Sequence, residues 1–229
     1  MINGKLLVMM PAFNEAKNIA QAIKEVRAYS PAIDIVVIND GSTDDTAAIA
    51  AESKVAVVSL PFNCSLGSAE ITGFMYAAEN KYDITFRVDA DGQHIPGEID
   101  TLAKPIINGE ADMVIGSRQN YRFPLARKTG SLIFSLVVKL ITGQRIPDCT
   151  SGFRAFNLAA INFLKNNYAD DYAEVDSIIS LTQAGFRVTE VPVAMRYRAG
   201  GNSYLSLWRS VEYMLKVILN ILIKSFRRK

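Results

Sequence analysis

Short aliphatic segments recur through the first half of this chain, and each is followed by a polar loop and then by a helical pattern. The predicted strands run from Leu6 to Met10, Ile35 to Ile38, Val55 to Leu60 and Ile84 to Val88. Strands that alternate with helices in this way are typical of βαβ units. We therefore predict an α/β fold in which a mostly parallel sheet is covered by helices.

The alternation becomes irregular after about residue 120, and no repeat or linker marks a second core domain. Here we predict a strand from Met113 to Gly116, an apolar helix from about Pro124 to Thr142 and a loop from Pro147 to Gly152. Two more helices precede a strand from Arg187 to Val193. Residues 1–204 are therefore expected to form one domain.

Polar residues follow the first, second and fourth predicted strands. The three loops carry Pro11–Glu15, Asn39–Ser42 and Asp89–Gln93. In an open parallel sheet, ligands bind where several strands deliver loops at their carboxyl ends. Acidic side chains gathered there suit a cation or ribose hydroxyls, so we predict a ligand site at this edge.

Asp89 and Asp91 are one residue apart at the end of a predicted buried strand. Both carboxylates can then face one hard divalent ion, Mg²⁺ or Mn²⁺, with a nucleoside diphosphate completing its coordination. Two aspartates at this spacing are weak evidence alone, and their place after an apolar strand strengthens it. The chain has neither a GxxxxGK[ST] nor a GxGxxG motif, and one histidine with two distant cysteines cannot build a zinc site.

Two further loop residues leave alternatives open. His94 has the chemistry of a general base, although a loop histidine serves more often as a hydrogen-bond partner of its neighbours. Asp40 can bind a base or a ribose edge, although Asp-Gly-Ser after a strand is also an ordinary turn and helix cap. Because Asp40 and the Asp89 loop are expected at one edge, we favour a binding role for Asp40.

Several arginines stand in loops beside predicted apolar helices. The planar guanidinium of arginine suits phosphate recognition. A single loop arginine is more often a surface charge, but several together favour an acceptor with a phosphate head and an apolar tail. We expect the acceptor phosphate to contact Arg118, Arg127 and Arg154.

Composition and charge exclude several classes of protein. Apolar residues make up 49% of the chain, which argues against disorder, and a net charge of +2 is too small to indicate nucleic-acid binding. Cys64 and Cys149 stand far apart and no cleavable signal pattern is seen, so we expect a reducing, cytoplasmic compartment. No apolar stretch reaches the roughly 20 residues of a transmembrane helix.

Residues 205–229 have the most regular helical pattern in the chain. A polar stripe that recurs every three or four residues comprises Arg209, Glu212, Lys216, Asn220, Lys224 and Arg227. The broader remaining face is apolar, and the end of the chain is basic. Such a helix lies in a membrane interface or packs against the domain or a second subunit, and the pattern alone does not separate these readings.

Seven ordered motifs now identify a resemblance that covers nearly all of residues 5–205: PAFNE, NDGSTDDT, NCSLGSAEITG, DADGQHIP, GSR, DCTSGFR and RAGGNS. They resemble the family 2 glycosyltransferases close to dolichyl-phosphate mannose synthase and the undecaprenyl-phosphate sugar transferases. The resemblance implies the GT-A fold, a Rossmann-like sheet flanked by helices, and a divalent metal. It also implies a nucleotide-sugar pocket lined by Pro11, Ala12, Phe13, Glu15, Asp40, Gly67, Asp89, Ala90, Asp91 and Arg198.

The same resemblance implies roles around the diphosphate. Asp89, Asp91 and Gln93 would hold the metal, and Arg118 and Arg127 would act in catalysis beside the donor and acceptor phosphates. Two departures from the family pattern matter. Tyr204 stands where related enzymes often have a lysine, and the transmembrane helices that many members add are not seen here.

The reaction implied is inverting transfer of a sugar from UDP-glucose, UDP-N-acetylglucosamine or GDP-mannose to a polyprenyl phosphate. The enzyme would lie peripherally on the inner face of the cell membrane, with a small membrane protein or a second copy as a possible partner. One alternative keeps the fold but uses a hydroxyl acceptor, with a base from Asp170, Asp171, Glu174 or Asp176. The other is a non-catalytic nucleotide-binding module at the membrane surface.

Overall fold

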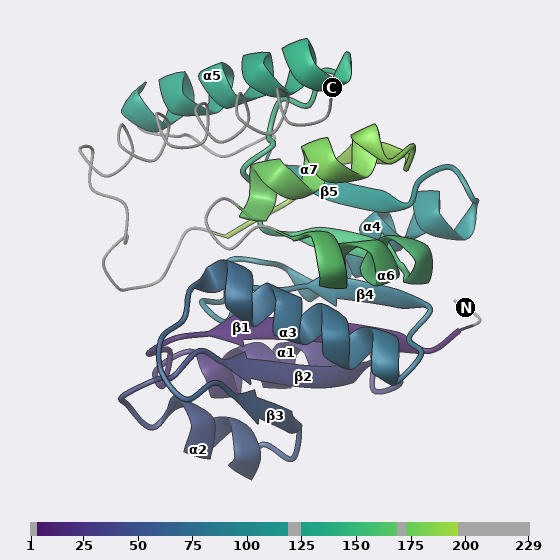
Figure 1. Ribbon diagram of the computed structural model, residues 1–229. Coiled ribbons are helices and arrows are strands. Elements are labelled where there is room, and N and C mark those ends of the chain that lie inside the picture. Colours follow the sequence, from purple (N-terminus) through teal and green to yellow (C-terminus); the bar gives the residue numbers. More distant parts are fainter. Residues whose placement is uncertain (1–3, 119–124, 169–172, 197–229) are drawn as a thin grey trace.

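The computed structural model describes residues 4–118, 125–168 and 173–196, in which strands and helices alternate through the first half of the chain (Figure 1). The strands are β1 (Leu6–Ala12), β2 (Asp34–Asn39), β3 (Ala56–Ser59), β4 (Ile84–Arg87), β5 (Met113–Arg118), β6 (Arg154–Asn157) and β7 (Val188–Val193). The helices are α1 (Ile19–Tyr29), α2 (Thr46–Glu52), α3 (Leu66–Glu79), α4 (Ile99–Ile107), α5 (Leu125–Thr142), α6 (Leu158–Asn167) and α7 (Ala173–Gln183), with a short 3₁₀ turn η1 (Pro96–Glu98) before α4.

The strands form one sheet in the order β3-β2-β1-β4-β6-β5-β7. Strands β3, β2, β1 and β4 are parallel neighbours, as the βαβ pattern predicts, and β5 pairs in parallel with β7. The predicted α/β class with a mostly parallel sheet is therefore confirmed.

Both faces of the sheet are covered by helices, which explains why the interior strand β1 is apolar at every position. Leu7 and Met9 of β1 belong to the core under α3, α5, α6 and α7, whereas Val8 and Met10 belong to the core under α1 and α4. All seven residues of β1 are buried. A strand covered on both faces reads as a continuous apolar run instead of an alternating one.

Strand β6 is the element that the sequence pattern missed. It lies between β4 and β5 and runs antiparallel to both. The sequence pattern predicted only a loop up to Gly152 followed by helices, because the four residues of β6 include no β-branched side chain and only two apolar ones. Through this antiparallel strand, the loop 147–153 reaches the edge at which β1, β2 and β4 end.

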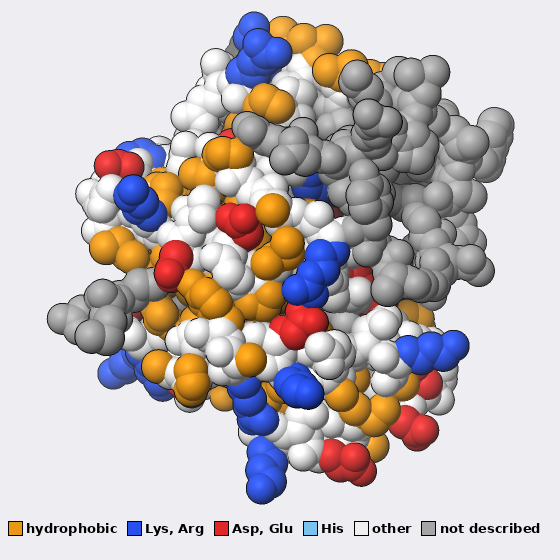
Figure 2. All heavy atoms as spheres, turned by 180° about the vertical axis from the view of Figure 1, so that it is seen from behind, with side chains coloured by type: hydrophobic (Ala, Val, Ile, Leu, Met, Phe, Trp, Pro, Cys, Tyr) orange, Lys and Arg blue, Asp and Glu red, His pale blue; other side chains and the backbone are white. Residues whose placement is uncertain are grey.

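Charged side chains of both signs are interspersed over the face of the molecule opposite to that seen in Figure 1 (Figure 2). Within the described ranges, none of the helices combines the length and apolar composition that crossing a bilayer requires. The predicted amphipathic helix at 205–229 lies outside the described residues, and so does Tyr204.

Candidate active site

The three polar loops lie at one edge of the sheet, because β2, β1 and β4 are parallel neighbours. Hydrogen bonds continue the pairing past the strand ends: the Asp40 amide donates to the Ala12 carbonyl (2.9 Å) and the Val88 amide to the Met9 carbonyl (3.1 Å). Pro11 and Ala12 end β1 as buried residues. The loops that we predicted to meet are therefore held together by the backbone.

Side-chain hydrogen bonds join the first two loops. The Asn14 amide donates to Ser42 Oγ (3.0 Å), and the Thr43 amide donates to Asn14 Oδ1 (2.9 Å). The amide of Glu15 donates to Thr46 Oγ1 (2.9 Å) in the first turn of α2. One wall of the predicted nucleotide pocket, which includes the half-buried Phe13, is thus fixed before any ligand binds.

Asp40 ties a further loop to this edge of the sheet. Its side chain is buried, and its two carboxylate oxygens accept hydrogen bonds from the backbone amides of Cys64 (2.8 Å) and Ser65 (3.3 Å). Ser65 caps α3, and Gly67 lies buried in the first turn of that helix. Asp40 therefore connects the end of β2 to the loop before α3, and each of its oxygens keeps lone-pair capacity for a ligand.

Asp89 and Asp91 lie directly after β4 with partly exposed carboxylates, while Ala90 between them is buried. The backbone amide of Gln93 donates to Asp91 Oδ1 (3.0 Å), and the Gln93 side-chain amide donates to Asp91 Oδ2. Burial raises the pKa of Asp89, but the positive charges of Arg87 and Arg118 outweigh it and hold that pKa below its usual range. Asp89 is therefore a carboxylate at neutral pH.

These side chains fit a magnesium or manganese ion that is shared with a diphosphate. The described part of the chain contains no group of three or more carboxylate, histidine or cysteine side chains that would hold a metal unaided. Mg²⁺ is commonly held by one or two carboxylates together with substrate phosphates. Asp89 and Asp91 offer two such carboxylates, and the side-chain oxygen of Gln93 is a third hard ligand nearby.

His94 is a neighbour of the aspartate pair and not an open base. It is buried, its ring stacks on Phe153 with centroids 4.6 Å apart, and its Nδ1 accepts a hydrogen bond from the Asp89 amide (2.9 Å). Burial lowers the pKa of His94, although the charges of Asp89 and Asp91 act against this. The neutral ring therefore supports the backbone at Asp89, which agrees with the more modest of the two sequence readings.

The predicted phosphate-binding arginines lie in different environments. Arg118 ends β5 beside the site and is oriented by Asp148, whose Oδ2 lies 2.7 Å from its Nε, and by Thr150 Oγ1 (3.0 Å). Arg127 belongs to α5, but its side chain lies outside the described residues, as does Arg198.

Arg154 does not lie where a phosphate could reach it. It is fully buried, and its guanidinium donates to the carbonyls of Ser151 (2.7 Å), Glu174 (2.9 Å) and Cys149 (2.9 Å). Its donors are used to join the loop before β6 to α7. The predicted contact between Arg154 and an acceptor phosphate is therefore wrong for this structure, because a buried arginine with these partners is an internal clamp.

The glycosyl transferase family 2 profile matches residues 7–164, which carry the sheet edge described above. The chain belongs to this family. The chain is 30% identical over 227 residues to the polyprenol monophosphomannose synthase of Mycolicibacterium smegmatis, covering 93% of this chain and 85% of that protein. It is 29% identical over 221 residues to the UDP-N-acetylglucosamine–dolichyl-phosphate N-acetylglucosaminyltransferase of Methanococcus voltae. This match covers 86% of this chain and 88% of that protein.

Solved structures agree with the fold. Glucosyl-3-phosphoglycerate synthase from Mycobacterium tuberculosis, in complex with Mn²⁺, UDP and phosphoglyceric acid, superimposes with a TM-score of 0.78 at 20% identity, covering 96% of this glycosyltransferase and 78% of that chain. The fold of this family 2 glycosyltransferase is therefore GT-A.

Sequence reasoning missed a buried ionic group behind the aspartate pair. Arg87, at the end of β4, contacts Glu70 of α3, Asp89, and Glu174 of α7. Burial raises the pKa of Glu70 to about 7, although the charge of Arg87 lowers it. The signal available in the sequence was an arginine as the one charged residue of a predicted buried strand, since a charge at such a position is rarely buried without partners.

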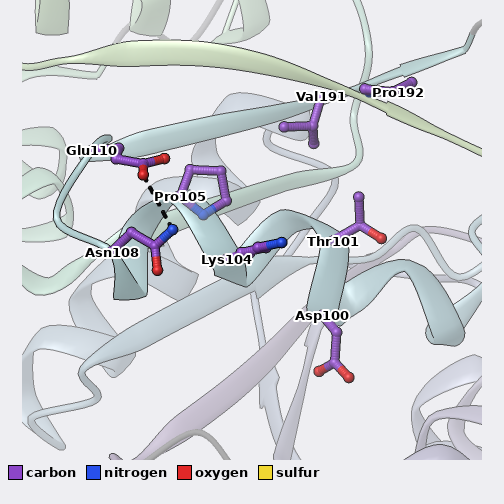
Figure 3. A pocket seen from close by; sticks show the side chains of 8 residues that line it. All are labelled: Asp100, Thr101, Lys104, Pro105, Asn108, Glu110, Val191 and Pro192. Carbon is purple, nitrogen blue, oxygen red and sulfur yellow. Dashed lines mark hydrogen bonds between the residues drawn. The ribbon is translucent and has the colours of Figure 1, made fainter.

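A groove on another part of the glycosyltransferase is separate from this site (Figure 3). It has a volume of about 570 Å³ and is lined by Asp100, Thr101, Lys104, Pro105, Asn108, Glu110, Val191 and Pro192. The side chain of Asn108 donates to Glu110 across one end (3.1 Å). None of the predicted site residues lines it, so the groove is not a candidate for the donor pocket.

The two cysteines are expected to react very differently. Cys149 is fully buried, and burial raises the pKa of its thiol to about 12, whereas Cys64 is half-buried in the loop held by Asp40. Because the thiolate is the reactive form, a thiol reagent should modify only Cys64 in the native protein and both cysteines after unfolding. Addition of UDP and Mn²⁺ should slow the reaction of Cys64. Modification of two thiols per native protein molecule would contradict the buried position of Cys149.

Proposed function

We propose that this glycosyltransferase moves a sugar from a nucleoside diphosphate sugar to a polyprenyl phosphate at the inner face of the cell membrane. The observation that carries the proposal is the pair of carboxylates, Asp89 and Asp91, at the sheet edge beside the loop held by Asp40. The names of the two sequence relatives support a polyprenyl-phosphate acceptor. The donor is UDP-glucose, UDP-N-acetylglucosamine or GDP-mannose.

The nucleotide and the diphosphate are assigned to different parts of this edge. The donor pocket comprises Pro11, Ala12, Phe13, Glu15, Asp40, Gly67, Ala90 and Arg198. Asp89, Asp91 and Gln93 would hold Mg²⁺ or Mn²⁺, which would neutralise charge on the departing nucleoside diphosphate. Arg118 and Arg127 are assigned to the phosphates.

The acceptor phosphate needs no general base. A phosphate monoester has a second pKa of about 6, so near neutral pH it is mostly a dianion whose oxygens need lose no proton before attack. One of these oxygens attacks the anomeric carbon from the face opposite to the nucleoside diphosphate. The new carbon–oxygen bond forms while the bond to the diphosphate breaks, the diphosphate takes the electron pair, and the configuration inverts. The protein's task is to align the two phosphates and the sugar.

Helix α5 supports the proposed membrane contact. Four of the eight large apolar side chains that are exposed among the described residues belong to it: Leu132, Ile133, Leu136 and Leu140. Leu132, Leu136 and Leu140 are four residues apart and so share one face of the helix. Leu140 is 76% exposed, and the neighbouring Lys139 is exposed as well. An exposed apolar face of this kind is suited to a lipid interface.

Charges placed on this face should weaken lipid binding. Each leucine that enters lipid contributes about 1.5–3 kcal/mol, so Leu136→Glu with Leu140→Glu should reduce co-flotation with phosphatidylglycerol vesicles at least about tenfold. Ile107→Glu changes an exposed apolar residue on α4 and is the matched control, for which binding should be unchanged. Full flotation of the double variant would assign the membrane contact to another segment, such as residues 205–229.

The proposed reaction is tested by a panel of radiolabelled UDP- and GDP-sugars offered to undecaprenyl phosphate in detergent, with Mn²⁺ or with a chelator. Metal-dependent label in the lipid fraction is the expected result, and it would also name the donor. Absence of transfer from every donor, in protein that still binds a nucleotide sugar, would overturn the polyprenyl-phosphate acceptor. Absence of any transfer or donor hydrolysis would favour the non-catalytic binding module.

A hydroxyl acceptor is the second candidate, because Glu174 of α7 contacts Arg87, which in turn contacts Asp89. The carboxylate of Glu174 lies 3.4 Å from Arg87 and is partly exposed. Asp176 is buried against Ser180 (3.3 Å), and Asp170 and Asp171 lie outside the described residues. A sugar hydroxyl requires a base, so Glu174→Gln should abolish transfer to a soluble oligosaccharide, whereas the lost contact with Arg87 should lower transfer to a lipid phosphate by no more than about 10- to 100-fold.

A further inference from the structure

The buried ionic group behind the aspartate pair consists of Arg87, Glu70, Asp89 and Glu174, here called the Arg87 cluster. Arg87 Nε lies 3.3 Å from Asp89 Oδ1, and both terminal guanidinium nitrogens lie 3.4 Å from Glu174 Oε1. Arg87 also forms an ion pair with Glu70 Oε1. The cluster therefore joins strand β4 and helices α3 and α7 to one of the two proposed metal ligands.

The members of the cluster differ sharply in their access to water. The side chains of Glu70 and Arg87 are 1% and 3% exposed, whereas those of Glu174 and Asp89 are 17% and 33% exposed. Arg87 therefore lies inside the protein, and Asp89 is the member of the cluster that reaches the site at the surface. Burying a charge costs several kcal/mol, and a well-packed apolar pair is often as stable. Stability alone is thus a poor explanation for this arginine.

The geometry restricts Asp89 from several sides. Arg87 occupies Oδ1, while Oδ2 lies 3.7 Å from His94 Nε2, and the Asp89 amide is bonded to the same histidine ring. Gly152 packs closely against another side of the carboxylate, since a methyl group added to it would lie 2.9 Å from both Arg87 Nη2 and Asp89 Oδ2. Such tight surroundings fix the direction in which the carboxylate points.

The charges of the cluster also favour a cation beside Asp89. A lone buried arginine next to a metal ligand would repel a divalent ion. Glu174 and the ionised form of Glu70 offset the charge of Arg87, so that Asp89 keeps its own negative charge for the site. Tyr168 donates a hydrogen bond to Glu70 Oε2 and thereby holds the innermost carboxylate in place.

We propose that Arg87, held by Glu70 and Glu174, is a positioning residue that orients Asp89 for binding of the divalent metal and the nucleoside diphosphate. This inference rests on the proposed metal role of the aspartate pair. Groups that orient metal ligands without touching the metal typically change metal affinity or activity by about 10- to 100-fold when they are removed.

The test is a binding measurement without sugar transfer. Mn²⁺ is titrated into the full-length protein with saturating UDP, and free Mn²⁺ is followed by electron paramagnetic resonance. The variant is Glu70→Gln with Arg87→Met, which removes the innermost pair of opposite charges together, and its thermal unfolding is recorded in parallel. We expect a folded protein whose Kd for Mn²⁺ is raised at least about tenfold.

The matched control removes another ion pair, Asp112 with Arg187, by Asp112→Asn with Arg187→Met. This pair lies at the opposite edge of the sheet, before β5 and β7 (3.0 Å). Its Mn²⁺ affinity should equal that of the wild type. A folded Glu70→Gln, Arg87→Met protein with a Kd within about twofold of the wild type would overturn the inference.

Arg87→Lys decides the question if the double variant does not fold. Lysine keeps the positive charge, but its single ammonium group cannot contact three carboxylates in the geometry of the guanidinium fork. The same tenfold and twofold thresholds apply. Asp91→Asn distinguishes the two proposals. If this variant binds Mn²⁺ as tightly as the wild type, the proposed metal role of the aspartate pair fails. If Asp91→Asn weakens Mn²⁺ binding but Arg87→Lys does not, only the proposed role of Arg87 fails.

Discussion

Replacement of Asp91 by asparagine is expected to lower the rate of sugar transfer at least about 100-fold. Loss of the charge stabilisation that the metal supplies would raise the activation free energy by several kcal/mol. The fold should survive. Asp91 is only half-buried, and an asparagine side-chain oxygen can still accept the hydrogen bond from the Gln93 amide. The unfolding midpoint should therefore stay within about 3 °C of the wild type. Transfer assays and thermal denaturation of the same preparation measure both quantities.

Asp83→Asn is the matched control for this variant. Asp83 is exposed and lies just before β4, at the other end of the strand that leads to the aspartate pair. The same chemical change there should leave the transfer rate unaltered. Transfer by Asp91→Asn at a rate close to the wild type would contradict the assigned metal role.

Gly41→Ala should both destabilise the protein and weaken nucleotide binding. Gly41 has φ +63°, and an added Cβ would lie 2.2 Å from the Phe62 carbonyl carbon and 2.5 Å from the Asn63 nitrogen. The backbone of residues 62–63 would have to move, and the contacts of Asp40 with the loop before α3 would be lost. Left-handed strain and overpacking together cost about 3 kcal/mol, which corresponds to about 10 °C in the unfolding midpoint.

A second glycine variant separates the cost of backbone strain from the cost of the steric overlap. Gly109 has a similar φ of +67°, but nothing lies within 4 Å of its added Cβ. Gly109→Ala should therefore cost only about 1 kcal/mol, from backbone strain alone, and leave UDP binding unchanged. Calorimetric unfolding and UDP titration of both variants provide the comparison. Equal losses of stability would show that the approach of Phe62 to Gly41 is unimportant.

The parallel half of the sheet was predictable because its strands are rich in aliphatic residues and each is followed by a polar loop and a helical pattern. β1 is buried on both faces, and the carboxylates of the site stand directly after such strands. Adjacent parallel strands bring their carboxyl ends to one edge, so the positions of the Asp40 and Asp89 loops followed from strand order.

The parts that were not predictable depend on contacts between distant segments. β6 has four residues and owes its place to pairing on both sides, with β4 and β5. Arg154 and Arg87 both lie in short segments. The predicted strand around Arg87 indicates that its side chain is buried, but nothing local identifies the partners of either guanidinium group. Their partners Glu174 and Glu70 come from helices whose packing is set by the whole sheet.

The position of β6 also has a consequence for the order in which the molecule can assemble during synthesis. Strands β1 to β4 pair with one another in parallel through connections that are complete by residue 87. Strand β5 is made next, but it has no neighbour in that sheet until residues 154–157 insert between it and β4. We therefore expect the sheet of β1 to β4 to form early on the ribosome. Strand β5, which bears Arg118, can join this sheet only after about 40 further residues have been synthesised.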